Sequence, residues 1–273
     1  MSTTLARART LLFAPGHRPD RFAKASASGA GLVVLDLEDA VAPADKEAAR
    51  GHVRDWLADG HPCAVRVNAS GTPWHEDDLD ALSGHDCVVM VPKSESAAVL
   101  SGITSRTGVG VLALVETAAG VLEAPRIAAA TGVERLALGT FDLAAELGVS
   151  PDDHAAMAWS RGALVLASAA AAIAPPVDGV TGDVGDDERL RSDVRRAAAV
   201  GFSGKLCIHP RQVALAEEQL APAAEEVRWA RTVLAGVEAA GGAAVVVVEG
   251  RMVDKPVIDR ARRILEEQSA NDG

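Results

Sequence analysis

The chain of 273 residues carries 38 acidic and 27 basic side chains, which gives a formal net charge of −11. This acidic balance argues against nucleic-acid binding, which requires a basic face. The N-terminal segment MSTTLARARTLLFAPG lacks the long apolar stretch of a signal peptide, no apolar run approaches the roughly 18 residues of a membrane span, and the three cysteines are widely spaced; we therefore expect a cytoplasmic protein with free thiols.

Eight short apolar runs recur along the first 210 residues, each bounded by Gly, Pro, Asp or Asn. Their length and β-branched content favour buried strands. Longer amphipathic stretches, such as PADKEAARGHVRDWLAD and DDERLRSDVRRAAAVG, separate them and predict helices. The predicted strands cover residues 10–14, 32–36, 63–68, 87–93, 109–116, 135–140, 175–180 and 204–208.

Eight strand–helix alternations at this chain length predict a closed (β/α)8 TIM barrel over residues 1–220. An open doubly wound sheet is the alternative, but no GxGxxG fingerprint follows any of the strands. Residues 221–273 exceed what eight units require. There PAAEEVRWARTVLAGVEAAGG predicts a helix, the apolar stretches AVVVVEG and RMVDKPVI follow, and DRARRILEEQ predicts a last helix that frays into SANDG.

Polar residues follow seven of the eight predicted strands, at the ends that carry function in such a barrel. A single charged residue there is most often a helix cap or a surface residue, but so many at one mouth predict a site. Carboxylates with few His or Cys neighbours favour Mg²⁺ or Mn²⁺ over zinc. These residues are Asp36, Glu38, Asp39, Arg66, Asn68, Lys93, Glu116, Thr117, Thr140, Asp142, Asp178 and His209.

A compact basic segment, PGHRPDRFAKA, follows the first strand at residues 15–25. Its cations are His17, Arg18, Arg21 and Lys24. They are either the solvated face of the first helix or a site for the phosphates of a nucleotide-like ligand.

Eight motifs occur along the chain in the order seen in the citrate lyase β-subunit-like proteins. They are LLFAPGHRPDRFAKA, VVLDLEDAVAPADKEAAR, VRVN, VMVPKSES, ALVETAAGV, LALGTFDLAAELG, GKLCIHPRQV and EGRMVDKPVI. From about residue 9 to residue 262 the chain resembles this group, which belongs with the malyl-CoA and citramalyl-CoA lyases of the HpcH/HpaI aldolase superfamily. The resemblance implies a TIM barrel, usually a homotrimer, that cleaves or forms a C–C bond next to a CoA thioester.

The resemblance also implies roles for single residues. Glu116 and Asp142 match the direct Mg²⁺ ligands, and Arg66 matches the arginine that contacts the oxo-acid and thioester oxygens. The segment with Asp36 and Glu38, which also includes Asp39, matches the acidic residues that hold metal-bound water and support this arginine.

Two further regions of the chain have counterparts in the family. The segment from Pro15 to Lys24, which contains His17, Arg18 and Arg21, matches part of the CoA-binding edge, with Lys93 and the CIHP stretch nearby. Asp254 matches the acid/base that a neighbouring subunit contributes, so residues 221–273 are expected to form a lid on the next subunit.

The chain departs from the family pattern at three positions. Phe141 precedes the proposed metal-binding aspartate where Glu or Asn is frequent, which puts the identity of the oxo-acid in doubt. Lys255 stands where a small residue is frequent, and His17 stands where Asn or Asp is common.

The leading hypothesis is an Mg²⁺-dependent lyase acting on a 3-hydroxyacyl-CoA, such as malyl-, citramalyl- or hydroxymethylglutaryl-CoA, to give an acyl-CoA and an oxo-acid. Three alternatives remain. A metal-dependent aldolase of free oxo-acids is disfavoured by the basic segment, and a β-subunit of a multisubunit citrate lyase by the lack of an obvious docking helix. A binding protein without activity is disfavoured by the complete carboxylate set.

Overall fold

The computed structural model describes residues 2–241 and 245–269. The chain forms two compact units, a larger one up to Leu220 and a smaller one that begins at Ala221.

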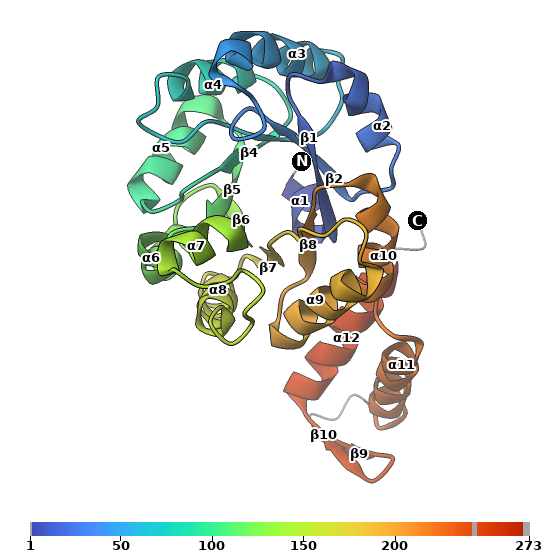
Figure 1. Ribbon diagram of the computed structural model, residues 1–273. Coiled ribbons are helices and arrows are strands. Elements are labelled where there is room, and N and C mark those ends of the chain that lie inside the picture. Colours follow the sequence, from blue (N-terminus) through green and yellow to red (C-terminus); the bar gives the residue numbers. More distant parts are fainter. Residues whose placement is uncertain (1, 242–244, 270–273) are drawn as a thin grey trace. The chain divides into compact units, whose positions relative to one another are not determined.

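The larger unit is a closed barrel of eight parallel strands, in which each strand pairs with the next and β8 pairs with β1 (Figure 1). All eight predicted strands are present, with ends that differ by no more than two residues from the prediction, which confirms the (β/α)8 barrel. The strands are β1 Thr10–Pro15, β2 Leu32–Asp36, β3 Ala64–Arg66, β4 Val88–Val91, β5 Gly110–Val115, β6 Val133–Leu138, β7 Ala174–Asp178 and β8 Gly204–Cys207.

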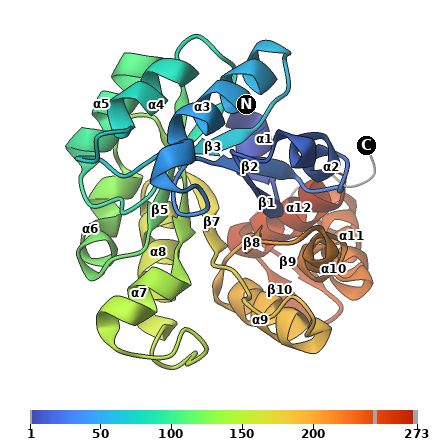
Figure 2. The ribbon, with the colours of Figure 1, turned by 45° about the horizontal axis from the view of Figure 1, so that its top comes forward.

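Helices surround this barrel, as Figure 2 shows. They are α2 Phe22–Ser26, α3 Lys46–Ala58, α4 His75–Leu82, α5 Ala97–Thr107, α6 Ala118–Ala128, α7 Thr140–Leu147, α8 Ala158–Ala170, α9 Asp187–Val200 and α10 Pro210–Leu220, with 3₁₀ turns η1 Pro19–Arg21 and η2 Pro43–Asp45. The short helix α1, Ser2–Arg7, precedes the barrel. Of the helices that the structure describes, none is long and apolar enough to cross a membrane.

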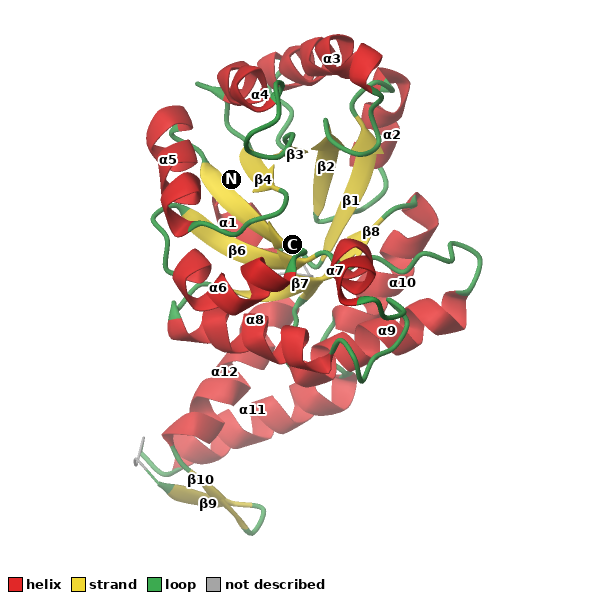
Figure 3. Ribbon diagram, turned by 60° about the vertical axis from the view of Figure 1, so that its left-hand side comes forward, coloured by secondary structure: helices red, strands yellow, loops and turns green. Residues whose placement is uncertain are grey.

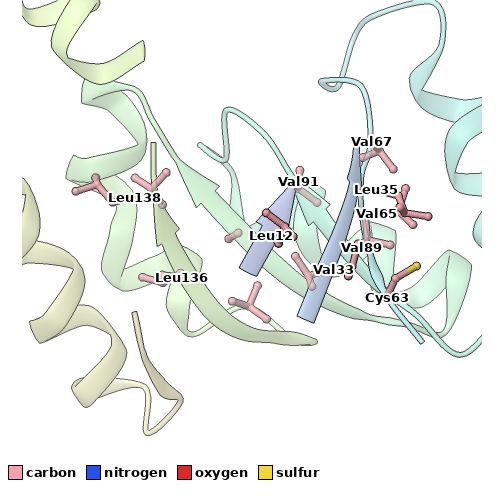
Figure 4. Close-up of a cluster of buried hydrophobic side chains, with 14 of the residues drawn as sticks. Leu12, Val33, Leu35, Cys63, Val65, Val67, Val89, Val91, Leu136 and Leu138 are labelled. Carbon is pink, nitrogen blue, oxygen red and sulfur yellow. The ribbon is translucent and has the colours of Figure 1, made fainter. Parts of the chain in front are cut away.

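Alternation along the strands sorts the apolar side chains into two layers. One layer fills the barrel interior and includes Leu11, Val34, Ala64, Met90 and Leu112. The other lies between the strands and the helices, and Figure 4 shows part of it, with Leu12, Val33, Leu35, Cys63, Val65, Val67, Val89, Val91, Leu136 and Leu138 labelled.

The same alternation brings polar residues to the mouth of the barrel. Asp36 comes two residues after the interior residue Val34, and Arg66 two residues after Ala64, so both continue the inward face. Asp36 and Arg66 are also register partners on neighbouring strands. The sequence therefore places this charged pair at the carboxyl end of the barrel.

Near the amino-terminal end of the barrel, the side chain of Arg135 of β6 is a fully buried cation. Its Nη1 donates to the carbonyl oxygens of Leu5 (2.8 Å) and Ala8 (2.6 Å), and its Nε to that of Pro175 (2.7 Å). Its Nη2 donates to Ser203 Oγ at 2.9 Å. Burial lowers the pKa of Arg135 to about 9. This side chain ties the C-terminal end of α1 to the barrel.

The three cysteines are free and buried, as the sequence predicted. Burial raises the pKa of Cys63, and it raises the pKa values of Cys87 and Cys207 to about 12. The protonated thiols act as small apolar core residues.

The smaller unit contains two helices, α11 Ala224–Ala239 and α12 Lys255–Ser269, joined by an antiparallel hairpin of β9 Val246–Val248 and β10 Arg251–Val253 (Figure 3). The unit has its own apolar core, which includes Val227, Ala230 and Val253. The hairpin was not predicted, and α12 begins four residues earlier than the DRARRILEEQ pattern indicated. The predicted fraying over SANDG falls largely on residues 270–273, which lie outside the described residues.

Candidate active site at the mouth of the barrel

The turn after β2 is organised around the carboxylate of Asp36. Its oxygens accept two parallel hydrogen bonds from Arg66, Nε to Oδ1 at 2.8 Å and Nη2 to Oδ2 at 2.7 Å. They also accept the backbone N–H groups of Glu38 (2.9 Å) and Ala40 (3.1 Å). The fork geometry fixes the plane of the guanidinium. Asp36 therefore orients both Arg66 and the acidic turn.

Glu38 lies buried between two cations. Its Oε2 is 3.0 Å from Arg66 Nη1, and its Oε1 accepts a hydrogen bond from Lys93 Nζ at 2.9 Å. Burial raises the pKa of Glu38 in spite of both partners. Asp39 is 61% exposed and only approaches Arg66, at 3.6 Å. Asp36 and Glu38 thus act on the same side, and Asp39 is peripheral.

Lys46, the first residue of α3, stabilises the turn after β2. This residue was not identified from the sequence. Its buried Nζ donates to the carbonyl oxygens of Leu37 and Glu38, both at 2.8 Å, and lies 5.1 Å from the centre of the Trp74 ring. Burial lowers the pKa of Lys46. A lysine in the first turn of a helix is unfavourable because its charge opposes the helix dipole. This unusual position is the feature of the sequence that could have identified Lys46.

Lys93 adopts a left-handed backbone conformation, with φ of +46°. Such strain costs of order 1 kcal/mol in a non-glycine residue. In this conformation its backbone N–H donates to Glu116 Oε1 at 2.9 Å while its Nζ bonds Glu38 and lies 3.7 Å from Glu116 Oε1. The resemblance associated Lys93 with the CoA edge, whereas the structure places it between two carboxylates of the mouth.

Glu116 follows β5 and is 2% exposed. Burial, with repulsion from Glu38 and Asp142, raises the pKa of Glu116 to about 7, although Lys93 opposes the shift. Gly139 makes room for this carboxylate, because a side chain there would collide with Glu116. Asp142 lies in the first turn of α7. The two proposed metal ligands therefore lie close enough to repel each other.

The charges of this cluster do not balance. The cluster is rich in acids: the four carboxylates of Asp36, Glu38, Glu116 and Asp142 lie near three cations, Arg66, Lys93 and Lys46. Two carboxylates completed by water and substrate oxygens are a donor set that suits Mg²⁺. Within residues 2–241 and 245–269, no group of three His, Cys, Asp or Glu side chains is placed to hold a metal ion by itself. The residues fit a divalent ion that shares its coordination with a ligand.

A cavity of about 980 Å³ opens beside this cluster. Arg18, Arg21 and Lys24 line one part of it, and Arg66 lies in its wall. Arg18 is partly neutralised by two hydrogen bonds to Asp20, at 2.8 and 2.7 Å. The lining residues are Leu12, Phe13, Ala14, Pro15, Arg18, Asp20, Arg21, Lys24, Ala25, Asp36, Asp39, Ala40, Arg66, Val180, Ile208, His209 and Pro210.

The basic segment and the CIHP stretch thus meet at one cavity. Of the basic segment, His17 is not among the lining residues. The cavity is of the size that takes up small ligands, and it joins a basic edge to the Arg66–Asp36 pair.

Two strand-end residues are engaged elsewhere. Asn68 Nδ2 donates to Asp78 Oδ2 at 2.6 Å. Asp178 accepts from Arg161 Nε at 2.9 Å and from Lys205 Nζ at 3.1 Å, and all three are buried. These groups pair with one another, although Arg161 Nη1 is buried without a hydrogen-bond partner, so the structure gives them a role in the barrel wall.

Asp254 belongs to the smaller unit. Its Oδ1 accepts the backbone N–H of Val257 at 3.4 Å, at the beginning of α12. Its carboxylate therefore caps this helix, and its part in catalysis stays a prediction.

Comparison with known proteins places the chain in a family. Residues 9–210 match the family described as HpcH/HpaI aldolase/citrate lyase. A citrate lyase subunit beta-like protein of Mycobacterium tuberculosis is 43% identical over 93% of both chains. An L-malyl-CoA/beta-methylmalyl-CoA lyase of Cereibacter sphaeroides is 36% identical over 94% of this chain and 93% of the relative.

Solved structures agree with these matches. The structure of CitE from Mycobacterium tuberculosis in complex with magnesium, acetoacetate and coenzyme A has a TM-score of 0.83 and 40% identity, covering 97% of this chain and 99% of that one. The citrate lyase beta subunit complexed with oxaloacetate and magnesium, from the same organism, has a TM-score of 0.73 and 41% identity, covering 80% of this chain and all of that one. The chain therefore belongs to the HpcH/HpaI aldolase/citrate lyase family. This confirms the family resemblance and the expectation of a lyase-type enzyme.

Proposed function

We propose that this member of the family is an Mg²⁺-dependent carbon–carbon lyase that acts on a 3-hydroxyacyl-CoA. One observation carries the proposal: Arg66, in the wall of a cavity with a basic edge, contacts Glu38 of the acid-rich cluster that also contains Glu116. Malyl-, citramalyl- and hydroxymethylglutaryl-CoA are the candidate substrates. The related enzyme of Cereibacter sphaeroides is named for malyl-CoA and beta-methylmalyl-CoA.

Glu116 and Asp142 would hold the metal ion. Bound there, Mg²⁺ (or Mn²⁺) would act as a Lewis acid toward the oxygens of the substrate. The excess negative charge at Glu116 supports this assignment, as does the magnesium in the related CitE complex. Glu38 and Lys93 hold the surroundings of Glu116 in place through the contacts at 2.9 Å.

Arg66 would stabilise the charge that develops during cleavage. When the substrate hydroxyl loses its proton and the C–C bond breaks, the electron pair of that bond becomes the enolate of the acyl-CoA. The guanidinium is held by Asp36, its Cζ lies 5.0 Å from the centre of the Phe13 ring, and it lines the cavity. A fixed cation at the enolate oxygen stabilises the transition state.

The basic edge of the cavity would receive the phosphates of CoA. Arg21 and Lys24 line it, and Arg18 shares its charge with Asp20. The CitE complex that contains coenzyme A supports a CoA ligand for this fold. An aldolase of free oxo-acids would not need these cations.

Asp254 is proposed as the acid that returns a proton to the enolate carbon, supplied by a neighbouring subunit of a homotrimer. A mixing experiment tests this arrangement. Asp254→Ala and Arg66→Ala, each inactive alone, should recover part of the activity after subunit exchange. No recovery after confirmed exchange would count against a shared site.

The decisive experiment incubates the protein with Mg²⁺ and a panel of 3-hydroxyacyl-CoA esters and identifies the products by mass spectrometry. Cleavage to an acyl-CoA and an oxo-acid supports the proposal. Calorimetry with CoA separates it from an aldolase of free oxo-acids, which would not bind CoA. Activity of the purified protein on free CoA esters excludes dependence on a citrate lyase complex. Failure to bind any divalent ion at millimolar concentration would favour a binding protein without activity.

A further inference from the structure

Phe141 is a large apolar side chain in the first turn of α7 that is 45% exposed. The core face of this helix is already supplied by Leu143 and Ala144, which are fully buried. The ring of Phe141 therefore adds little to the core of the barrel. It directly precedes Asp142, and consecutive residues of a helix project about 100° apart. Phe141 and Asp142 therefore leave the same first turn of α7 in different directions.

The ring packs over Gly182, in the loop between β7 and α9. A Cβ at Gly182 would lie 2.9 Å from Phe141 Cζ and 3.6 and 3.9 Å from its Cε atoms. These ring atoms are the nearest neighbours of that Cβ, and the φ of Gly182 is outside the left-handed region. The backbone would accept alanine there, so the steric demand for glycine comes from the ring.

The ring belongs to a half of the mouth that differs in chemistry from the rest. The charged cluster comes from the ends of β2 to β5 and the first turn of α7. Val180, after β7, and Ile208, after β8, line the cavity, as does Phe13 of β1. Phe141 is not itself a lining residue, but its ring packs over Gly182, two residues after Val180, which places it at the edge of this apolar side.

We propose that Phe141, seated on Gly182, is a specificity-determining residue that selects an oxo-acid fragment with a small alkyl group. This inference rests on the proposed function. A phenyl ring gains contact with a methyl group and gains nothing from a hydrogen atom, so it favours pyruvate over glyoxylate as the oxo-acid. One methyl group in an apolar pocket is worth roughly 10- to 200-fold in kcat/KM.

The test uses the condensing direction with acetyl-CoA. The methyl group of acetyl-CoA loses a proton, its carbon bonds to the carbonyl carbon of the oxo-acid, and the carbonyl oxygen becomes a hydroxyl by taking up a proton. We measure kcat/KM for pyruvate and for glyoxylate with the Mg²⁺-loaded protein. Wild type should prefer pyruvate, and Phe141→Ala should lower this preference about tenfold. Leu147→Ala is the matched control, because Leu147 is 44% exposed at the far end of the same helix.

A double-mutant cycle tests whether the packing of the Phe141 ring over Gly182 matters for the pyruvate preference. Gly182→Ala should displace the ring and lower the pyruvate preference in the wild-type background. In the Phe141→Ala background the same substitution should have no further effect, because no ring remains to be displaced. Thermal unfolding of each variant checks that the fold is kept.

Two outcomes overturn the inference: an unchanged pyruvate-to-glyoxylate ratio in an active Phe141→Ala, or equal effects of Gly182→Ala in both backgrounds. If no variant condenses any oxo-acid with acetyl-CoA, the proposed function fails separately. In that case, calorimetry measures the affinities for pyruvate and for glyoxylate in the presence of Mg²⁺, and their ratio tests the role of Phe141. A Phe141→Ala variant with the same ratio of the two affinities as wild type overturns the role of Phe141, and a lowered pyruvate preference upholds it.

Discussion

The two ends of the barrel differ in how fully their buried charges are compensated by groups of the chain. At the amino-terminal end, the Arg135 guanidinium finds four acceptors within the chain at 2.6 to 2.9 Å. At the mouth, Glu38 and Glu116 are buried with raised pKa values, and acids outnumber cations. The first arrangement is complete without any ligand, whereas the second is complete only when a cation joins it.

This difference separates stabilising charges from binding charges. A buried charge is tolerated when its hydrogen bonds are satisfied internally, and it is costly otherwise. Several unfavourable features occur together at the mouth. They include the left-handed backbone conformation of Lys93 and the repulsion of the Glu116 carboxylate by neighbouring acids. Local rules are broken where a site must bind something. Substitutions at the two ends should therefore affect different quantities.

The largest expected effect is on activity at the mouth. Glu116→Gln keeps the shape of the side chain but removes a proposed metal ligand, so kcat/KM should fall by about 10³-fold. The unfolding midpoint of the metal-free protein should not fall at pH 8, because the substitution relieves repulsion from Glu38 and Asp142. Steady-state kinetics with and without a chelator, and thermal unfolding, check both halves. Full activity of Glu116→Gln without added Mg²⁺ would show that the metal assignment is wrong.

Arg135→Leu should produce the reverse pattern. It removes four hydrogen bonds and takes the side-chain donor away from the buried carbonyl oxygens of Leu5 and Ala8, which costs about 3 kcal/mol of unfolding free energy. The activity of the folded fraction should stay near that of wild type. Urea unfolding provides the measurement, and the exposed Arg126→Leu serves as the control, with a change within about 0.5 kcal/mol. A large loss of kcat with unchanged stability would contradict the contrast between the two ends.

Lys46→Met tests a residue that belongs to both categories, since it is buried like Arg135 but supports the mouth. Loss of its bonds to Leu37 and Glu38 should cost about 2 kcal/mol of stability. Glu38 would then hold Lys93 less firmly, so kcat should fall more than KM rises. Arg54→Met, at an exposed position of the same helix, is the matched control. Unchanged kcat in a destabilised Lys46→Met would reduce Lys46 to a purely structural residue.

The sequence predicted the inward-facing carboxylates better than the groups that hold them. The family resemblance associated Asp36 with Arg66, and the register of the neighbouring strands β2 and β3 explains their pairing. The position of Lys93 depends on a backbone conformation that no propensity predicts for lysine. The packing of Phe141 over Gly182 depends on the first turn of α7, after β6, meeting the loop that follows β7. Such contacts follow from packing between segments, which a linear pattern does not contain.

The smallest effects should come from the basic edge of the cavity. Lys24→Ala and Arg21→Ala should each raise KM for the CoA ester severalfold with kcat unchanged, because an exposed cation contributes modestly to binding a phosphate. Arg18→Ala should raise KM less, since Asp20 already accepts both of its hydrogen bonds. The differences between variants should shrink in 0.5 M salt, which screens these charges. Kinetics at low and high salt, with the concentration of oxo-acid held saturating, measure the effect. A fall in kcat at constant KM would instead place these cations at the reacting centre, and the division of the mouth into a binding edge and a catalytic cluster would then be wrong.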